Sequence, residues 1–463
     1  MVQPRRGASS QPAPADRKAD SSPQSLAPGL AVRLAAADVY RDILSARQSL
    51  EDRLGAETIS GRFRAFDARD LGLMRSIVVT SLRRRGSILH ALAQCLERGM
   101  PGRDMRVESI LVTAAAQILY LDVPDRSAVD LAVRAARMEP GARPFAALVN
   151  AVLRNVARNS ASFQGDDDPL RDTPAWLADR WSATFGGPAA AAIAASHRHE
   201  PTLDLTVRGE PEAWAARLGG RVLPTGSVRL VARTPVTRLD GYDEGEWWVQ
   251  DCAAALPARI LAARPGERIA DLCAAPGGKT AQLATAGAQV SAVDRSERRL
   301  QRLRANLQRL RLDAEVVTAD ALTFAPADLF DAVLVDAPCT ATGTIRRHPE
   351  VAWIKREQDI RALAELQRRL LDHAATLLRP GGRLVYCTCS LEPEEGERQV
   401  DALLARNCAL TRAPIDPEEI AGMAECVSAV GDVRVMPYFL RDDDPRLSGM
   451  DGFFIARLLR APH

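Results

Sequence analysis

The sequence predicts a multidomain protein whose C-terminal half has an α/β fold, and two patterns support this. In the C-terminal half, short apolar runs alternate with helix-forming segments, which is typical of a mostly parallel sheet with helices on both faces. The expected strands lie near residues 268–272, 288–293, 314–318, 330–335, 382–387 and 453–459. In the N-terminal third, apolar residues recur at helical spacing instead, which predicts an all-α domain. The length of 463 residues leaves room for about two to four domains.

The all-α domain is expected over residues 30–162 and is rich in arginine. Val32, Ala35, Ala36 and Val39 illustrate its helical spacing. Residues 31–163 contain 20 Arg and 14 acidic residues, a net charge of +6, and all of their basic residues are Arg. Arg suits bidentate contact with phosphate better than Lys does, which favours nucleic-acid binding. A composition set by a GC-rich genome would produce the same bias.

Two segments of different composition flank this domain. Residues 1–28 are rich in Pro, Ser, Ala and charged residues. They cannot bury a core, and we expect them to be disordered. Residues 164–169, which include three consecutive Asp, are interpreted as a linker.

Residues 170–245 are expected to form a small α+β subdomain. Short β-like runs at 203–207 and 228–231 lie around a helix near 212–218. The α/β domain then occupies residues 246–463.

Within the α/β domain, two helices are well marked. Leu300, Leu303, Leu307 and Leu310 form one apolar face at helical spacing. A long helix over 360–378 is expected to end at Arg379-Pro380-Gly381-Gly382, because Pro and Gly do not continue a helix.

The composition argues against several classes of protein. No run approaches eighteen uninterrupted apolar residues, so no membrane span is expected. No apolar core precedes a cleavage site near the N-terminus, so we expect a cytoplasmic protein with free thiols. The eight cysteines include no C-x-x-C pair and there are only six His, so no metal site is expected.

A Gly-rich turn follows the first expected strand of the α/β domain. Residues 268–280 read Arg-Ile-Ala-Asp-Leu-Cys-Ala-Ala-Pro-Gly-Gly-Lys-Thr, the order of a strand, a turn and a helix start. Gly277 and Gly278 let the backbone approach a ligand closely, and the helix start offers unpaired N–H groups. A plain βα connection would also contain such glycines. Asp294 ends the next apolar run, where βαβ units place the acceptor for ribose hydroxyls.

The ligand of this turn is expected to be a nucleoside without a pyrophosphate. No Lys-Ser/Thr follows a G-x-x-x-x-G spacing, which argues against a P-loop. Ala-Ala-Pro stands where a dinucleotide site needs its first Gly. S-adenosylmethionine fits this description.

Chemically active residues are expected at the carboxyl ends of several strands, where open α/β sheets bind ligands. The strand ends carry Asp271, Asp294, Asp320, Asp336 and the run Cys387-Thr388-Cys389. Asp336 opens the segment Asp-Ala-Pro-Cys339. Two cysteines at neighbouring strand ends, Cys339 and Cys389, indicate a thiol-dependent reaction. The alternative is that these cysteines are small apolar residues of buried strand ends.

These motifs together resemble the RNA cytosine-5 methyltransferases. The resemblance covers about residues 170–460 and implies a Rossmann-like class I methyltransferase domain. The matching motifs are Asp-Leu-Cys-Ala-Ala-Pro-Gly-Gly-Lys-Thr (271–280), Asp-Ala-Pro-Cys-x-x-x-Gly (336–343), Thr-Cys-Ser (388–390), Gln250-Asp251, Arg346-Arg347-His348-Pro349 with Trp353, and Asp451-Gly452-Phe453-Phe454.

The helical segment resembles the NusB-type RNA-binding domain. The matching residues are Phe145, Val149, Asn150, Val152, Leu153 and Arg154. A fusion of the two parts is characteristic of the bacterial small-subunit ribosomal RNA methyltransferase B group, also called Sun or Fmu.

The resemblance implies a role for each matching residue. Cys389 would be the nucleophile that adds to C6 of cytosine, after which C5 accepts the methyl group. Cys339 would assist release, and Asp336 would hydrogen-bond the cytosine edge close to the methyl donor. Asp294 would hold the ribose hydroxyls and Asp320 the adenine amino group. The turn that would wrap the methionine and ribose consists of Cys273, Ala274, Ala275, Pro276, Gly277, Gly278 and Lys279.

The implied substrate is a cytosine in small-subunit (16S) ribosomal RNA, either free or in an assembling particle, bound by a monomer. Arg83-Arg84-Arg85 of the helical domain would grip phosphates, although such a triplet also suits a solvated surface. Lys279 is expected to lower the pKa of a nearby thiol.

The sequence departs from the family pattern at two places. Cys387 stands where the family has Ser or Ala, which puts a third thiol near the site. Residues 203–207 lack the Arg and Asn of the family's Leu-Arg-Val-Asn, which leaves the RNA contacts of the small subdomain open.

Three other functions remain open at this point. The protein could be a transfer RNA cytosine-5 methyltransferase. It could be a non-catalytic RNA-binding or assembly factor, although such a factor need not keep both cysteines. Methylation of an exocyclic amine would leave Cys389 without a role.

Overall fold

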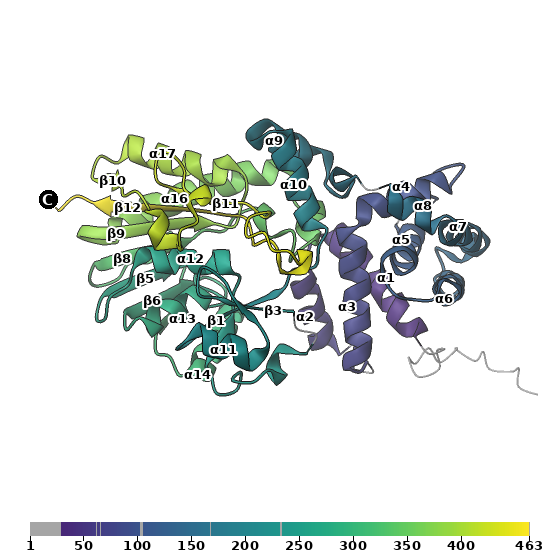
Figure 1. The fold of residues 1–463 in the computed structure, drawn as a ribbon, viewed down its shortest axis with the longest axis horizontal. Coiled ribbons are helices and arrows are strands. Elements are labelled where there is room, and N and C mark those ends of the chain that lie inside the picture. The colour runs from purple at the N-terminus through teal and green to yellow at the C-terminus, as the bar shows by residue number, and fades with distance from the viewer. Residues whose placement is uncertain are drawn as a thin grey trace, which may run out of the picture.

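The structure is a computed structural model that describes residues 29–462 except 62, 65, 102–104, 167 and 232–233. The disorder expected for residues 1–28 lies outside the described residues, as does Asp167 of the expected linker. A helical part and a part built on a large sheet lie side by side (Figure 1). None of the helices described is both long and apolar enough to cross a membrane.

The helical part is built around α5, which is apolar on nearly all sides. Val107 and the residues from Ser109 to Leu119 of this helix are buried, and α1, α3, α4, α6 and α7 all pack against it. The helices are α1 (Leu30–Ala46), α2 (Leu50–Ser60), α3 (Ala68–Arg83), α4 (Arg85–Gln94), α5 (Arg106–Tyr120), α6 (Asp125–Met138), α7 (Ala146–Arg158) and α8 (Ser160–Gly165). The all-α prediction for this segment is therefore confirmed.

A smaller sheet of order β2-β3-β1-β4 follows, with all its strands antiparallel. Its strands are β1 (Leu203–Val207), β2 (Arg221–Val222), β3 (Val228–Leu230) and β4 (Trp247–Val249), and its helices are α9 (Ala175–Phe185), α10 (Gly187–His197) and α11 (Pro211–Leu218). Asp204 of β1 is fully buried and accepts two hydrogen bonds of 2.7 Å from Arg229 of β3. Asp204 stands where the family pattern Leu-Arg-Val-Asn has Arg, and in this chain it forms an internal ion pair with Arg229.

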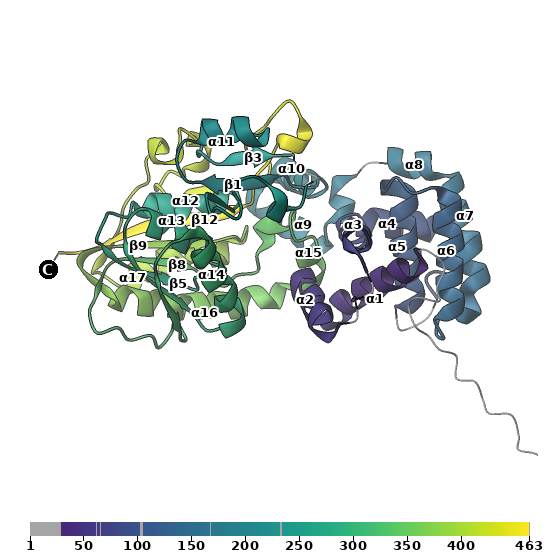
Figure 2. The ribbon, with the colours of Figure 1, turned by 90° about the horizontal axis from the view of Figure 1, so that it is seen from below.

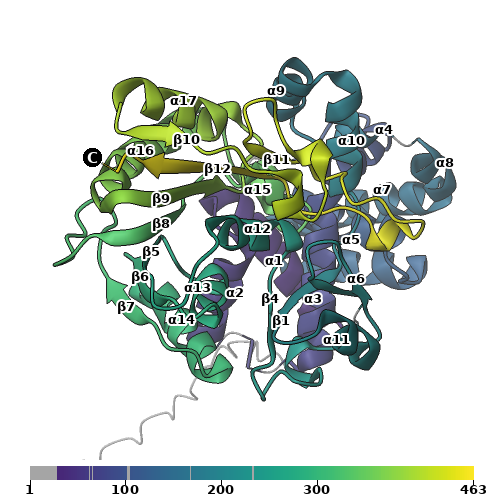
Figure 3. The same cartoon turned by 60° about the vertical axis from the view of Figure 1, so that its left-hand side comes forward.

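The large sheet has the order β10-β12-β9-β8-β5-β6-β7, with β11 paired to β12. Figure 3 shows these strands side by side in this order. Strands β5 to β9 are parallel to one another, whereas β12 runs antiparallel to β9. The strands are β5 (Arg268–Leu272), β6 (Gln289–Asp294), β7 (Glu315–Thr318), β8 (Phe330–Asp336), β9 (Leu378–Thr388), β10 (Leu410–Arg412), β11 (Val433–Val435) and β12 (Phe453–Arg460).

Helices cover both faces of this sheet. On one face, Ile269 and Leu334 pack with residues of α12 (Cys252–Leu261) and α13 (Gly278–Thr285). On the other face, Ala270 and Val333 pack with residues of α16 (Glu357–Thr376) and α17 (Glu397–Arg406). Alternate residues of each strand thus enter opposite cores, as a sheet buried on both faces requires. Leu300, Leu303 and Leu307 of helix α14 (Glu297–Leu310) pack against Ala274, Ala275 and Ala292, whereas Leu310, the fourth residue of the predicted leucine face, packs with Trp248 and Ala281.

The expected end of the long helix was placed wrongly. Helix α16 ends at Thr376, and Arg379 to Gly382 lie inside β9, which begins at Leu378. Leu378 pairs with Phe330 and Arg383 pairs with Ala332, so the pairing register shifts between these two contacts. This shift in register allows β9 to include Pro380, Gly381 and Gly382, although Pro and Gly normally interrupt a strand.

The two parts of the chain meet through the first helices of the helical part and a short helix, α15 (Glu350–Ile354), visible between them in Figure 2. The indole of Trp353 donates a 2.8 Å hydrogen bond to the Leu82 carbonyl. The backbone N–H of Leu50 donates to the Glu350 carboxylate at 3.1 Å. Arg47 donates to the Ile354 carbonyl at 2.6 Å.

Arg83, Arg84 and Arg85 belong to this interface, so the expectation that the triplet grips phosphates is wrong. Arg83 is 8% exposed and donates to the carbonyls of residues 197, 199 and 346 at 3.2, 2.9 and 2.7 Å. Arg84 pairs with Asp172 at 3.7 Å. Arg85 bonds Tyr40 and Glu108 and stacks over the Trp353 ring. The three guanidinium groups thus contact carbonyls, carboxylates and a hydroxyl within the protein.

Replacing Arg83 with Met should lower the free energy of unfolding by roughly 2–4 kcal/mol, because three carbonyls would lose charge-assisted hydrogen bonds. Burial lowers the pKa of Arg83 to about 10, so the side chain is still charged at neutral pH. Urea unfolding followed by tryptophan fluorescence measures the change. Arg98→Met, at an exposed position of the same helical part, is the control and should change stability by less than about 0.5 kcal/mol. Equal stability of the two variants would contradict this role.

Candidate active site

The candidate site lies at the carboxyl ends of β5, β8 and β9. The chain runs outward from β5 to β6 and β7, and then returns to place β8 on the other side of β5. Such a reversal of strand order opens a crevice at the strand ends. The Gly-rich turn follows β5, Asp336 ends β8, and Cys389 follows β9. The sheet therefore brings together the three motifs that are far apart in the sequence.

The turn after β5 has a backbone that only certain residues allow. Gly277 has a φ of 103°, and a Cβ at this position would lie 2.8 Å from Cγ of Leu303 in α14. Glycine is thus required both by the left-handed conformation and by the close approach of α14. Cys273 also has a positive φ of 63°, and the Ala275–Pro276 peptide bond is cis. Helix α13 begins directly after the turn, at Gly278.

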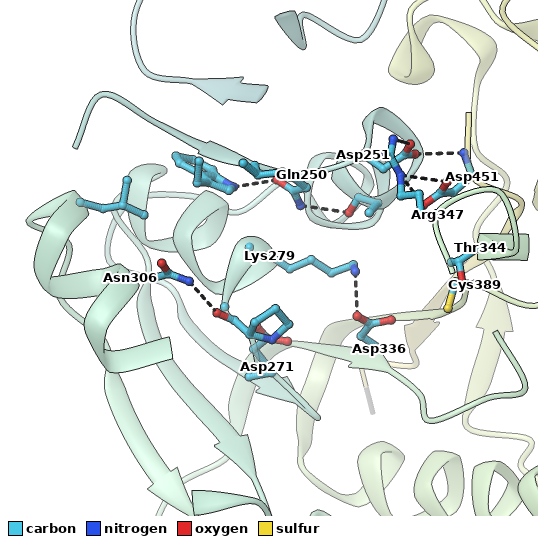
Figure 4. Close-up of a pocket in the computed structure, with 18 of the residues that line it drawn as sticks. Gln250, Asp251, Asp271, Lys279, Asn306, Asp336, Thr344, Arg347, Cys389 and Asp451 are labelled. Atoms are coloured by element: carbon cyan, nitrogen blue, oxygen red, sulfur yellow. Dashed lines mark hydrogen bonds and ion pairs between the residues drawn. The ribbon is translucent and has the colours of Figure 1, made fainter. Parts of the chain in front are cut away.

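A cavity of about 510 Å³ opens beside this turn (Figure 4). Residues expected to bind cofactor or substrate that line it are Ala274, Pro276, Gly277, Gly278, Lys279, Asp336 and Cys389. Residues of the earlier segments also line it, among them Tyr242, Gln250 and Asp251. The cavity thus lies between the large sheet and the segment that leads into it.

Lys279 and Asp336 form an ion pair at the centre of the cavity wall, with Nζ and Oδ2 separated by 2.7 Å (Figure 4). Burial alone would lower the pKa of Lys279, but the Asp336 carboxylate outweighs burial and the pKa is raised. The Cys387 thiol, 3.6 Å from the other oxygen of Asp336, is buried in the core of the sheet. Burial raises the pKa of Cys387 well above its usual value despite the nearby Lys279. Lys279 therefore forms its ion pair with the Asp336 carboxylate, and Cys387 remains a neutral thiol in the core.

The two motif cysteines meet at the site, with their sulfur atoms 3.5 Å apart. Cys389 lines the cavity, whereas Cys339 is absent from its lining. The hydrogen bond with Cys389, together with burial, raises the pKa of Cys339 well above its usual value. Cys339 is thus a protonated thiol beside the thiol that faces the cavity.

Two motif glycines allow the loop after β8 to approach the C-terminal strand. A Cβ at Gly343 would lie 2.1 Å from the Gly452 carbonyl oxygen. The backbone N–H of Gly452 donates to the Gly343 carbonyl at 2.8 Å, and that of Gly343 donates to the Cys389 carbonyl at 3.0 Å. These contacts hold the segments of both cysteines against the start of β12.

Asp294 and Asp320 do not line the cavity, and neither do Cys273 and Ala275. Asp294 is buried, and its carboxylate accepts from the N–H groups of Ala275 (3.3 Å) and Ser296 (2.9 Å). It also pairs with Arg299 at 3.1 Å. Asp320 is exposed and accepts from the Leu322 N–H at 2.9 Å. Asp294 is the last residue of β6 and Asp320 follows β7, so both lie farther along the sheet than the thiols.

Asp271, which the sequence predicted at a strand end of the crevice without an individual role, lines the cavity. It is fully buried, and its Oδ2 accepts from the Thr280 hydroxyl at 2.6 Å while its Oδ1 has no hydrogen-bond partner. Burial raises the pKa of Asp271 to about 7. The available signal for an individual role was an acidic residue inside an apolar strand, because Asp is almost never fully buried unless it is paired.

The sequence also left Arg347 without a role. Its guanidinium donates to Asp251 and to both oxygens of Asp451, the latter at 3.1 Å each (Figure 4). The carboxylates of Asp204 and Asp251 and the thiol of Cys252 lie within 4.8 Å of one another. Arg229 and Arg347 contact these two carboxylates. The network joins three motifs recognised in the sequence, but only the folded chain shows that they contact one another.

Comparison with protein families finds two matches in this chain. Residues 258–459 match the family described as 16S rRNA methyltransferase RsmB/F. Residues 30–158 match the NusB family.

Curated relatives match over nearly the whole chain. The ribosomal RNA small subunit methyltransferase B of Xanthomonas campestris pv. campestris is 36% identical, covering 95% of this chain and 99% of the relative. The protein of the same name from Vibrio cholerae is also 36% identical, covering 84% of this chain and 92% of the relative.

Solved structures share the fold. PH0851 superposes with a TM-score of 0.70 at 23% identity, covering 94% of this chain and 99% of that one. NSun6 from Pyrococcus horikoshii superposes with a TM-score of 0.52 at 20% identity, covering 63% of this chain and 98% of that one.

These matches confirm three predictions made from the motifs: the methyltransferase fold of the C-terminal part, the NusB-type helical domain and S-adenosylmethionine as the cofactor. The chain belongs to the 16S rRNA methyltransferase RsmB/F family.

Proposed function

We propose that the protein methylates C5 of a cytosine in small-subunit ribosomal RNA through a covalent bond between Cys389 and C6 of the base. The observation that carries this proposal is the meeting of Cys389, Cys339 and the Lys279–Asp336 pair at one cavity. A carbon of a pyrimidine ring is a weak nucleophile, and a thiolate added at C6 makes C5 electron-rich. Methylation of an exocyclic amine would not require this pair of thiols.

The residues of the turn after β5 suit S-adenosylmethionine, which supplies the methyl group when bound. The unpartnered Oδ1 of Asp271 is an acceptor in the cavity wall and fits the amino group of the methionine part. Gly277 and Gly278 leave room for the ligand beside the start of α13. We assign the ribose to Asp294 and the adenine to Asp320, at the ends of β6 and β7, on the resemblance of their positions to the family motif. Arg299 would have to release part of the Asp294 carboxylate to make room.

The chain's own residues then divide the reaction between them. The Cys389 thiol gives up its proton, which passes to N3 of the base, as its sulfur forms a bond to C6 and the C5–C6 π electrons move to C5. Asp336, held by Lys279, hydrogen-bonds the edge of the base as N3 gains a proton. After C5 has accepted the methyl group, its proton is removed, the electrons of the C5–H bond form the C5–C6 double bond and the S–C6 bond breaks. The Cys339 thiol, 3.5 Å away, gives its proton to the departing Cys389 sulfur and takes up the proton that leaves C5, while N3 loses its extra proton to solvent.

The remaining parts of the chain are assigned to RNA binding. We propose residues 30–162 as an Arg-rich RNA-binding domain, 170–245 as a second RNA-contacting subdomain and 246–463 as the catalytic domain. Contacts with phosphates would make binding weaken as salt rises. Since Arg83 to Arg85 are internal, the phosphate contacts must come from other arginines.

The covalent mechanism predicts opposite behaviour for the two cysteine variants. Cys339→Ala, mixed with RNA from a strain that lacks this enzyme and with S-adenosylmethionine, should retain a protein–RNA band after denaturation, because the release step fails. Cys389→Ala should form no band and should lose methylation by at least about a thousandfold, since the nucleophile is gone. Gel electrophoresis and sequencing of the trapped RNA identify the target.

The exposed Cys408 provides the control, because Cys408→Ala should methylate RNA normally and form no band. Methylation by Cys389→Ala at the normal rate would exclude the mechanism. If the trapped RNA is transfer RNA instead of ribosomal RNA, the proposed substrate is wrong.

The assignment of Asp271 predicts that S-adenosylmethionine binds more weakly as the pH falls. Burial raises the pKa of Asp271 to about 7, so below this value the carboxyl must lose a proton before it pairs with an amino group. Affinity should fall by up to about tenfold per pH unit between about pH 7 and about pH 6. Titration calorimetry on wild type and Asp271→Asn measures this, and the variant should lack the dependence. Asp313→Asn, at an exposed position, should behave as wild type. A variant with the wild-type pH dependence would remove Asp271 from the cofactor site.

A further inference from the structure

Glu395 lies buried between the two loops that bear the motif cysteines. It ends the short helical turn Pro393–Glu395, which follows the Thr-Cys-Ser motif, and it is 0% exposed. A buried carboxylate is costly unless its oxygens are hydrogen-bonded. Its contacts therefore indicate what it stabilises.

The carboxylate accepts hydrogen bonds from the residues that follow each cysteine. Thr340, directly after Cys339, donates its backbone N–H at 3.0 and 3.1 Å to the two oxygens and also donates its hydroxyl. Ser390, directly after Cys389, donates its hydroxyl at 2.6 Å. Thr340 and Ser390 are both fully buried. One carboxylate thus binds both cysteine loops at once.

Glu395 is itself held from several directions. Its backbone carbonyl accepts from the Tyr386 hydroxyl at 2.7 Å and from Thr388 at 3.2 Å, both in β9. Gln367 of α16 donates to the carboxylate at 3.1 Å and to the Pro338 carbonyl at 2.8 Å. Every group in contact with the carboxylate is a donor, as a carboxylate requires. The anchor is therefore fixed to the sheet and to α16.

We propose that Glu395 is a positioning residue that sets the distance between the Cys339 and Cys389 thiols. Thr340 and Ser390, which donate hydrogen bonds to this carboxylate, are the neighbours of Cys339 and Cys389. A shift of either donor residue therefore moves a sulfur atom. The role of this distance in catalysis rests on the proposed function, because release needs the Cys339 thiol beside the bond between Cys389 and the base. Glu395 does not line the cavity and acts only through the two loops.

A thiol–disulfide equilibrium tests the geometry without RNA. Glutathione disulfide oxidises the pair: two protein thiols become one disulfide while the oxidant is reduced to two glutathione thiols, and the equilibrium constant is the effective concentration of the pair. Glu395→Gln replaces one acceptor oxygen with an NH2 group that faces donors, so the effective concentration should fall at least about tenfold. Mass spectrometry of the peptides that contain Cys339 and Cys389 measures the disulfide specifically.

Glu394→Gln is the matched control. Glu394 is the neighbouring residue, and its carboxylate pairs with Arg180 at 2.7 Å and Arg398 at 2.9 Å instead of with the cysteine loops. This variant should keep the wild-type equilibrium. Ser390→Ala removes one hydrogen-bond donor and keeps the carboxylate, so its effective thiol concentration should lie between those of wild type and Glu395→Gln. This variant replaces Glu395→Gln in the test if Glu395→Gln does not fold.

Methylation provides the second readout. Glu395→Gln should lower kcat and accumulate part of the covalent protein–RNA adduct, while KM for RNA and the affinity for S-adenosylmethionine stay unchanged. A general loss of stability would not produce an adduct.

An unchanged thiol equilibrium in folded Glu395→Gln, or in Ser390→Ala if the former does not fold, overturns the inference. A fall in the thiol equilibrium without a change in kcat or adduct confines Glu395 to a structural role and equally overturns the positioning role. If wild type forms neither adduct nor methylated RNA, the proposed function fails, and with it the catalytic part of the inference, while the thiol equilibrium still decides whether Glu395 sets the distance.

Discussion

Parallel pairing of β8 with both β5 and β9 is the constraint on which the site depends. Register places Leu272 beside Val335 and Asp336 beside Cys387, so the residues that follow each strand emerge at one edge. Side chains in a parallel sheet cannot shift by one position without reversing which core they enter. Because both faces are buried, this register also sets where the Gly-rich turn, the carboxylate and the thiols meet.

Buried polar groups hold the segments around that edge in one arrangement. Glu395 joins the loops after β8 and β9, and Arg347 joins the segment before α12 to the segment before β12. Arg83 ties the helical part to the same region, since it donates to the carbonyl of Arg346, the neighbour of Arg347. Burying charges is costly, and truncating one partner leaves the other unsatisfied. The helical part thereby contacts the segment that supplies one wall of the cavity.

Predictions from the sequence succeeded where local pattern and chemistry agree. The six strands expected in the α/β domain are present, and Lys279, Asp336, Cys339 and Cys389 meet at one site. Predictions failed where the neighbours of a residue decide its role. The arginines of the triplet have partners from distant segments, and Pro380 lies in a strand because the pairing register shifts beside it. Strands β10 and β11 were missed since each has only three residues, too few for a periodic pattern.

The sequence alone determined the class of fold, the Gly-rich turn and the identity of the motif cysteines, because these depend on strand periodicity, glycine conformations and the order of short motifs. Only the tertiary structure decided that Cys389 faces the cavity with Cys339 beside it, that Cys387 is a core residue, and that Asp271 has an unpartnered oxygen in the cavity wall. The physical reason is that exposure and hydrogen-bond partners come from strands and helices far apart in the chain, whose contacts no local pattern records.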